Sequence, residues 1–249
     1  MTRKPLIAGN WKMHGALAES RQLVDALRAG VTPGAKATML LCPPFVYLPA
    51  VHGWLQGSPI LLGAQDLADK PATGAYTGEV SGQMLRDVGC GHVIVGHSER
   101  RALYGETDAI VATKFEAAQV AGLIPIVCVG ETLEQREASQ TRAVIERQVA
   151  AVVDSAGVQA FGKAVIAYEP VWAIGTGVTA TPADASAAHA LLRERLIGRW
   201  ERADVPILYG GSVKPDNASD LLAAEGVDGL LVGGASLDPQ GFARIAAAG

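Results

Sequence analysis

One stretch decides how the fold is interpreted: Ala164-Val165-Ile166-Ala167-Tyr168-Glu169-Pro170-Val171-Trp172-Ala173-Ile174-Gly175-Thr176-Gly177. Its apolar start predicts a buried strand that ends at Glu169. Pro170 fixes its own φ and favours an extended conformation for the residue before it. The short apolar segment that follows, bounded by Gly175 and Gly177, has the composition of a stiff lid with flexible ends. A strand that ends in a surface loop with a solvated glutamate is the alternative.

Apolar runs of this kind alternate with turns and helical patterns along the chain. The eight runs are Leu6–Lys12, Thr38–Cys42, Ile60–Ala64, His92–Gly96, Ile124–Val129, Ala164–Tyr168, Val205–Tyr209 and Val227–Val232. Runs that are apolar throughout are typical of parallel strands covered on both faces, and their alternation with helices predicts an α/β fold. Eight units in 249 residues, roughly thirty residues each, favour a closed (β/α)8 barrel over an open doubly wound sheet. No composition shift suggests a linker, so a single domain over residues 1–249 is expected.

Several helices are expected between these runs. Helical patterns lie near Leu17–Ala29 and Asp108–Ala121, and one long helix is expected after the fifth run, to about Asp154. Thr181-Pro182 and Asp238-Pro239 each place an N-cap residue before a proline at the first helical position, which predicts two further helix starts.

The composition argues against several classes of protein. Hydrophobic residues make up 49% and charged residues 18% of the chain, which argues against disorder. The formal net charge is −4 without a basic run, so neither nucleic acid nor a membrane is an expected partner. The cysteines, Cys42, Cys90 and Cys128, are odd in number and widely spaced, which indicates neither a zinc site nor a disulfide framework. A reducing, cytoplasmic location fits best.

In a barrel of this kind the chemistry belongs at the C-terminal ends of the strands. The polar residues and glycines at those ends are Asn10, Lys12, His97, Ser98, Glu99, Glu169, Gly210, Gly211, Ser212, Gly233 and Gly234. Gly211-Ser212 and Gly233-Gly234 follow the seventh and eighth runs, and each alone is only a turn. Together they match the usual phosphate site of a barrel, where backbone N–H groups face the anion.

Lys12 and His97 each have a functional and a structural interpretation. A fixed ammonium at Lys12, with Glu99 as its ion-pair partner, would bind an anion and stabilise developing negative charge. A solvated surface lysine and a first-turn acid of a short helix are the alternatives for these two residues. A helix N-terminus disfavours an imidazolium, so a neutral His97 could donate a hydrogen bond to a carbonyl oxygen and relay a proton. A buried structural histidine is the alternative.

Two other kinds of site are not supported by the sequence. The spacing Gly175-x-Gly177-x-x-Ala180 imitates a dinucleotide fingerprint, but it does not lie in a tight strand-to-helix turn. No metal-ligand motif such as His-Glu-x-x-His is present. We therefore expect neither a metal nor an organic cofactor.

The whole pattern resembles the triosephosphate isomerase family over nearly all of the chain. The segments that carry the resemblance are Gly9–Lys12, Gly74–Glu79, Val95–Arg101, Gly105–Thr107, Val127–Glu131, Tyr168–Gly177, Tyr209–Val213 and Leu231–Leu237. The resemblance implies a TIM barrel and the interconversion of dihydroxyacetone phosphate and D-glyceraldehyde 3-phosphate. One departure is Asp66, where many members carry asparagine, and it is expected to affect only loop detail.

The resemblance also implies a role for each matching residue. Glu169 would remove a proton from the carbon next to the carbonyl and return it to the neighbouring carbon. His97 would be the neutral electrophile, Lys12 would stabilise the enediolate and the phosphate, and Asn10 would help to place the carbonyl. The remaining implied roles are phosphate contacts from Gly175, Ser212, Gly233 and Gly234, and support of the catalytic groups by Ser98 and Glu99.

The longest connection implies a homodimer. Thr77 lies in the loop Gln65–Glu79 and, by the same resemblance, would reach the active site of a partner subunit. Two alternatives to the isomerase stay open. One is a Schiff-base aldolase on the same barrel with Lys12 as nucleophile. The other is a non-catalytic phosphate-binding barrel, against which the joint presence of Lys12, His97 and Glu169 argues.

Overall fold

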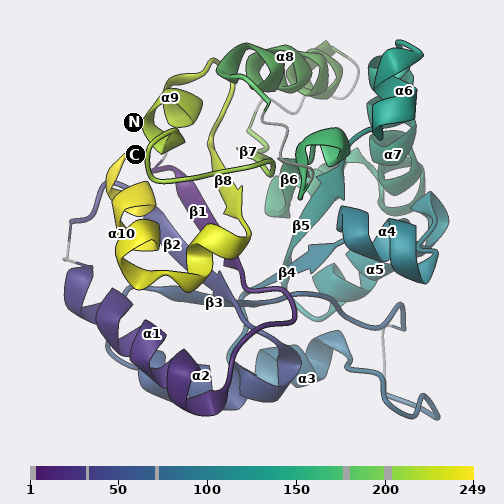
Figure 1. Cartoon of the computed structure of the whole chain (residues 1–249). Coiled ribbons are helices and arrows are strands. Elements are labelled where there is room, and N and C mark those ends of the chain that lie inside the picture. The colour runs from purple at the N-terminus through teal and green to yellow at the C-terminus, as the bar shows by residue number, and fades with distance from the viewer. Residues whose placement is uncertain (1–3, 32–33, 71–72, 176–179, 199–203) are drawn as a thin grey trace.

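The computed structural model describes residues 4–31, 34–70, 73–175, 180–198 and 204–249, and its parallel strands close into a barrel (Figure 1). The strands are β1 (Leu6–Asn10), β2 (Thr38–Cys42), β3 (Leu61–Ala64), β4 (His92–Val95), β5 (Ile124–Val129), β6 (Val165–Tyr168), β7 (Ile207–Tyr209) and β8 (Gly229–Val232). Each strand pairs with the next one along the chain, and β8 pairs with β1, where Gly9 lies opposite Val232. The predicted (β/α)8 barrel is therefore confirmed.

Helices surround the barrel on its outer side (Figure 1). They are α1 (Leu17–Gly30), α2 (Leu48–Leu55), α3 (Gly82–Asp87), α4 (Ser98–Tyr104), α5 (Asp108–Val120), α6 (Leu133–Glu137), α7 (Thr141–Ala156), α8 (Pro182–Gly198), α9 (Ala218–Ala223) and α10 (Pro239–Ala247). Short 3-10 helices lie in the connections at η1 (Phe45–Tyr47), η2 (Val158–Lys163), η3 (Val171–Ala173) and η4 (Gly234–Leu237). The last helix, α10, packs on α1 and so completes the outer ring. Among the described helices, none has the length and apolar character that a bilayer crossing requires.

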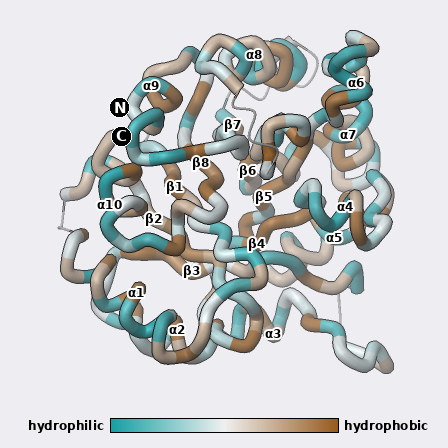
Figure 2. Tube along the Cα trace, in the orientation of Figure 1, coloured by the Kyte–Doolittle hydropathy of each residue, from teal (hydrophilic) through white to brown (hydrophobic). Residues whose placement is uncertain are grey.

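The barrel has two apolar layers because its strands are covered on both faces. The smaller layer fills the barrel itself and consists of Ala8, Leu40, Cys42, Ile94, Ile126, Cys128, Val165, Ala167, Leu208 and Leu231. The larger layer lies between strands and helices and includes the buried rings of Phe115, Phe161 and Phe242. Figure 2 shows hydrophobic strands at the centre and more hydrophilic stretches on the surrounding helices. Each large side chain buried in this way stabilises the fold by roughly 1.5–3 kcal/mol.

Both helix starts that were predicted from a cap residue before proline are confirmed. At the start of α8, Thr181 Oγ1 accepts a hydrogen bond of 3.2 Å from the Asp184 N–H. At the start of α10, Asp238 Oδ2 accepts one of 3.0 Å from the Gly241 N–H. These bonds satisfy N–H groups that the first turn of a helix leaves without intrahelical partners.

Two of the differences from the expected elements involve a residue with left-handed backbone. The first apolar run is Leu6–Lys12, whereas β1 ends at Asn10, and Lys12 beyond it has a φ of 52°, which a strand does not allow. The long helix expected after β5 is divided into α6 and α7, because Ser139 between them has a φ of 58°. Both differences arise at single residues with left-handed backbone, which apolar periodicity does not reveal.

Two buried histidines link the stability of the fold to pH. His92 and His189 are 9% and 0% exposed, and burial lowers the pKa of each to about 4. The ring of His189 lies 2.9 Å from the Gly226 carbonyl through Nδ1. Both rings are therefore neutral in the folded protein at pH values where an exposed histidine takes up a proton.

We expect the free energy of unfolding to fall as the pH is lowered from about 6.5 toward 4, because the unfolded chain then binds protons that the folded chain does not. Each histidine contributes at most roughly 3 kcal/mol to this loss, at about 1.4 kcal/mol per pKa unit. Urea unfolding across this range should show a weaker pH dependence in His189→Asn. The exposed His14 provides the control, since His14→Asn should keep the original dependence. An unaltered dependence in His189→Asn would contradict the assignment.

Candidate active site

A hollow of about 400 Å³ lies at the C-terminal ends of the barrel strands. Its lining includes all the residues predicted to touch a substrate, namely Asn10, Lys12, His97, Glu169, Gly175, Ser212, Gly233 and Gly234. Ser98 and Glu99 stand directly behind this lining, where they contact Glu169 and Lys12. Within the described ranges, no three His, Cys, Asp or Glu side chains are grouped as metal ligands would be.

Lys12 is held by contacts to three other residues. Its φ of 52° is unfavourable for a residue with a side chain. The Lys12 N–H donates to Asn10 Oδ1 at 3.0 Å, and Gln65 Nε2 donates to the Lys12 carbonyl at 2.8 Å. The ammonium lies 2.5 Å from Glu99 Oε1. Lys12 is thus a fixed charge at the hollow, and the solvated-lysine alternative does not describe it.

His97 precedes α4 and caps it. Its Nδ1 accepts a hydrogen bond of 3.2 Å from the Glu99 N–H, so the proton of the neutral ring is on Nε2. Nε2 lies 2.9 Å from Glu169 Oε1. Burial lowers the pKa of His97, but the Glu169 carboxylate outweighs burial and raises this pKa above its ordinary value.

Glu169 directly follows β6 and is only 2% exposed. Its N–H donates to the Val129 carbonyl at 2.7 Å, and its Oε2 accepts a hydrogen bond of 2.8 Å from the Ser98 N–H. Burial raises the pKa of Glu169, but His97 and the Ser98 N–H together outweigh burial and lower it. The carboxylate is therefore ionised, and it rests against the N-terminus of α4, where the helix dipole favours an anion.

The turn after β5 fixes the surroundings of Glu169. A Cβ atom at Gly130 would collide with the Glu169 carbonyl oxygen, so this position requires glycine. The next residue, Glu131, is fully buried and accepts hydrogen bonds from Tyr168 Oη at 3.1 Å and Trp172 Nε1 at 3.0 Å. Glu131 thereby anchors the start of the segment after Glu169. No role for Glu131 was predicted from the sequence, although it follows β5 after one residue, Gly130, and a carboxylate at a strand end is the signal that marked Glu169.

The glycine-rich part of the lining is suited to an anion. It includes Ser212, Gly233 and Gly234, and Gly234 opens the short helix η4, whose first N–H groups have no intrahelical partner. A Cβ atom on Gly233 would lie 3.4 Å from Lys12 Cε, so glycine leaves room for the lysine side chain. Backbone N–H groups beside an ammonium form a binding site for a phosphate group.

The described residues include only the first part of the predicted lid. Val171–Ala173 form η3, and the Arg136 guanidinium lies over the Trp172 ring at 4.2 Å from its centroid. Gly175 has a φ of 70°, which favours glycine. Thr176 and Gly177, the end of the predicted lid, lie outside the described residues.

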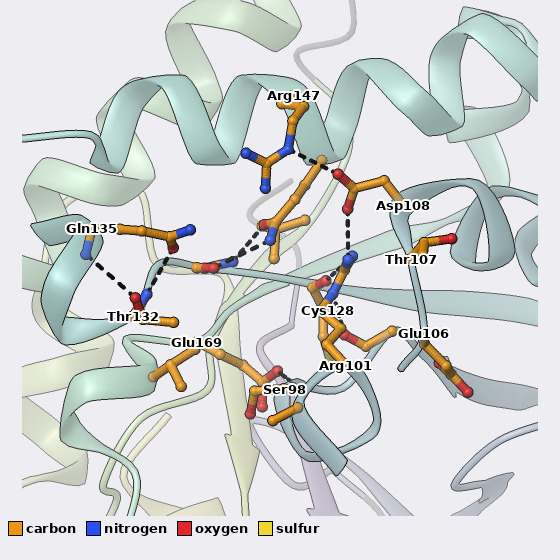
Figure 3. A pocket seen from close by; sticks show the side chains of 16 residues that line it. Ser98, Arg101, Glu106, Thr107, Asp108, Cys128, Thr132, Gln135, Arg147 and Glu169 are labelled. Atoms are coloured by element: carbon orange, nitrogen blue, oxygen red, sulfur yellow. Dashed lines mark hydrogen bonds and ion pairs between the residues drawn. The ribbon is translucent and has the colours of Figure 1, made fainter. Parts of the chain in front are cut away.

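A second hollow, of about 460 Å³, also has Glu169 in its lining (Figure 3). Asp108 joins two arginines in its lining, Arg101 at 2.6 Å and Arg147 at 2.9 Å. Glu169 is shared by both hollows. The groups predicted to bind substrate line the first one, which is therefore the candidate active site.

Comparisons with known proteins agree with this geometry. The family model for triosephosphate isomerase matches residues 5–249. Over 245 residues, the chain is 53% identical to triosephosphate isomerase from Nitrosococcus oceani and 50% identical to that from Dechloromonas aromatica, with 98% of each chain covered. The crystal structure of triosephosphate isomerase from Bartonella henselae matches with a TM-score of 0.88, at 41% identity and with 99% of each chain covered.

These matches decide among the alternatives that the sequence left open. A relative at 53% identity along almost the whole chain supports neither a Schiff-base aldolase nor a non-catalytic phosphate-binding barrel. The chain belongs to the triosephosphate isomerase family and interconverts dihydroxyacetone phosphate and D-glyceraldehyde 3-phosphate.

Proposed function

We propose that Glu169 is the base of this isomerase and that His97 and Lys12 act at the substrate oxygens. The observation that carries this proposal is that a buried carboxylate, an imidazole and an ammonium line one hollow, with His97 2.9 Å from Glu169. The reaction moves a proton between neighbouring carbons and converts a carbonyl to a hydroxyl beside it. It therefore needs a base at carbon and a proton donor at oxygen.

Glu169 reaches the substrate by turning away from α4. Its Oε2 accepts a hydrogen bond from the Ser98 N–H and its Oε1 lies 2.9 Å from His97 Nε2, so the carboxylate is held toward α4 in the present position. A carboxylate that leaves these contacts loses the groups that lower its pKa, and it becomes a stronger base. A C–H bond next to a carbonyl is only weakly acidic, so its removal requires a dry and aligned base of this kind.

His97 donates its Nε2 proton to the substrate oxygens and relays a proton between them. The Glu99 N–H on Nδ1 maintains the required tautomer. The Glu169 carboxylate is what raises the pKa of His97 in the present position. When Glu169 turns to the substrate, this influence ends, and burial then favours the neutral ring.

Lys12 and Asn10 stabilise and place the carbonyl end of the substrate. The enediolate intermediate carries negative charge on oxygen, and a fixed ammonium stabilises it more than a mobile one because no reorganisation is required. Asn10 Oδ1 is bound to the Lys12 N–H, which fixes the amide so that its NH2 group can orient the carbonyl. Ser98 and Glu99 support the site through their contacts with Glu169 and Lys12.

The phosphate group is bound by backbone N–H groups of the glycine-rich part of the lining. We assign these contacts to Gly175, Ser212, Gly233 and Gly234, which line the hollow. An enediolate next to a phosphate ester can also eliminate phosphate. Contacts that hold the phosphate, together with a segment that excludes water, oppose this side reaction.

Replacement of the base tests the assignment of Glu169. We expect Glu169→Gln to lower kcat by at least roughly 10²–10⁴, the scale of general base catalysis, while inorganic phosphate still binds. Initial rates with D-glyceraldehyde 3-phosphate in a coupled assay measure the change. Glu19→Gln, at an exposed position on α1, should keep full turnover. Near-normal turnover of Glu169→Gln would remove Glu169 from this role.

We further propose a homodimer formed through the loop Gln65–Glu79. Two features of the described part of this loop support it. Gln65 donates to the carbonyls of Lys12 and Cys42 at 2.8 Å and 2.9 Å, so the loop begins at the active-site end of the barrel. Further along the loop from Gln65, Tyr76 is 46% exposed and Thr77 is also exposed, so both side chains are accessible to a partner subunit.

Exposed apolar side chains lie near the base of the same loop. Met13 and Val46 are 93% and 78% exposed, and the connections that carry them are joined by a hydrogen bond of 2.7 Å from Tyr47 Oη to the Gly15 carbonyl. Large apolar side chains on one side of the barrel end favour burial against the same surface of a second copy. In such a dimer Thr77 would reach the partner's site.

Charges placed in this surface should weaken the dimer. We expect the double variant Tyr76→Asp/Thr77→Asp to shift toward the mass of one chain at low protein concentration, because the interface would have to bury two unpaired carboxylates. Sedimentation at several concentrations measures the shift. The control Val120→Asp places a carboxylate at an exposed apolar position outside the loop. Val120 is 72% exposed at the C-terminal end of α5, and its replacement should leave the mass of the protein unaltered. If the double variant kept the mass of the original protein at all concentrations, the proposed interface would be refuted.

Two broader assignments complete the proposal. One domain over residues 1–249 is supported by the closure of the barrel and by the packing of α10 on α1. A cytoplasmic location is supported by the three cysteines, which are free and buried, as expected for a reducing compartment.

A further inference from the structure

Lys12 depends on two residues that are distant from it in the sequence. Gln65 holds its carbonyl and Glu99 holds its ammonium. A non-glycine residue with a φ of 52° keeps this conformation only where its surroundings impose it. Whatever fixes Gln65 and Glu99 therefore also fixes Lys12.

Next to each of these two residues in the sequence stands a member of one buried ion cluster, formed by Asp66, Arg100, Glu106 and Lys114. Lys114 Nζ lies 2.6 Å and 2.8 Å from the two carboxylate oxygens of Asp66, and 2.5 Å from Glu106 Oε1. Arg100 Nε lies 2.9 Å from Asp66 Oδ2 and 2.6 Å from Glu106 Oε1. The four charges balance, with two positive and two negative groups.

The cluster is largely shielded from water. The side chains of Lys114, Asp66 and Glu106 are 7%, 12% and 5% exposed. Arg100, at 32%, forms its outer edge. Ion pairs at such depth are screened little by salt, and removal of one partner leaves an uncompensated buried charge. The cluster is therefore a stiff link between the loop that starts at Gln65 and the helix that carries Glu99.

We propose that Lys114 is a positioning residue for Lys12. It extends from α5 and, like Arg100, binds both carboxylates of the cluster, but it is the more buried of the two cations. Through Asp66 it fixes Gln65, and through the two carboxylates that it shares with Arg100 it fixes Glu99. This inference rests on the proposed role of Lys12 at the substrate.

The two carboxylates of the cluster are not equivalent. Burial opposes ionisation of Glu106, but Lys114 and Arg100 outweigh it and lower the pKa of Glu106. At Asp66 burial outweighs the attraction of Lys114, and the pKa is raised. Glu106 is thus the better compensated of the two carboxylates. Asp66 adds a negative charge that needs Lys114 for its compensation.

This asymmetry provides a test by charge compensation. In Lys114→Met, two buried carboxylates share one guanidinium. We therefore expect Gln65 and Glu99, the two residues that hold Lys12, to shift. The ratio kcat/KM should fall by roughly ten- to a hundredfold, the scale on which a misplacement of about 1 Å acts. The inhibition constant of inorganic phosphate should rise in parallel, because the Lys12 ammonium lies beside the phosphate site.

The double variant Lys114→Met/Asp66→Asn removes one charge of each sign and should recover most of both losses. Asp66→Asn alone leaves Lys114 bound to Glu106 and should stay close to the starting protein. Arg244→Met breaks an exposed pair with Asp216, in which the side chains are 67% and 88% exposed, and is the matched control without effect. A loss in the double variant equal to that in Lys114→Met would overturn the proposal.

Thermal unfolding separates positioning from stability alone. A lower melting temperature with unaltered KM and phosphate inhibition, measured well below that temperature, would also overturn the proposal. If Lys114→Met does not fold, Lys114→Arg retains the charge. Its larger head group should displace the two carboxylates, lower kcat/KM and raise the inhibition constant of phosphate, each to a smaller extent than in Lys114→Met. Unaltered values of both would count against positioning.

Lys12→Met, assayed in parallel, keeps this proposal distinct from the one on which it rests. Loss of most turnover in Lys12→Met together with unaltered kinetics in Lys114→Met would refute the inference about Lys114 alone. Full turnover in Lys12→Met would instead refute the proposed role of Lys12.

Discussion

The pairing of β1 with β8 is the constraint on which the rest of the structure depends. It joins the two ends of the sheet, so no strand of the barrel keeps an unpaired edge. Because all strands run in the same direction, their C-terminal ends meet around one rim. The closing pair itself places Lys12, just beyond β1, beside Gly233, just beyond β8. An ammonium and an anion-binding turn are thus neighbours although almost the whole chain separates them.

Charge is stabilised at this rim mainly by backbone groups and by paired side chains. The Glu169 carboxylate is bound by a backbone N–H and by His97, and the Lys12 ammonium is bound by Glu99. Each charge is compensated by these contacts, which limits the cost of burial. In the proposed mechanism, the carboxylate exchanges its contact with the N-terminus of α4 for one with a substrate carbon.

The sequence predicts the fold and the residues that meet at the first hollow, because both follow from local patterns. Apolar runs locate strands such as Thr38–Cys42 and Ile124–Val129 with the bounds that the structure gives. Polar residues directly after such runs, Lys12 and Glu169 among them, come together because strand ends do. Glu169 faces His97 beside α4, and this contact raises the pKa of His97. The contact depends on a side-chain orientation that no local sequence pattern encodes.

Long-range contacts explain what the sequence does not predict. Asp66 was expected to affect only loop detail, yet its carboxylate is buried and bound to Lys114, 48 residues further along the chain. The left-handed backbone of Lys12 is supported by Gln65, and the role of Glu131 becomes visible only when Trp172 packs against it. In each case one partner has an ordinary local sequence. Its importance is a property of the folded arrangement.

The way in which Lys12 is held also has a consequence for how activity appears during folding. Its supports lie 53 and 87 residues away, and the support of Glu169 from Ser98 spans 71 residues. Contacts of such separation form late, because the entropy of closing long loops is lost before the contacts compensate for it. A partly folded chain can contain helices and paired strands, but it has no lysine in place and no oriented carboxylate. With the proposed roles of Lys12 and Glu169, we therefore expect activity to require the closed barrel rather than its separate helices and strands.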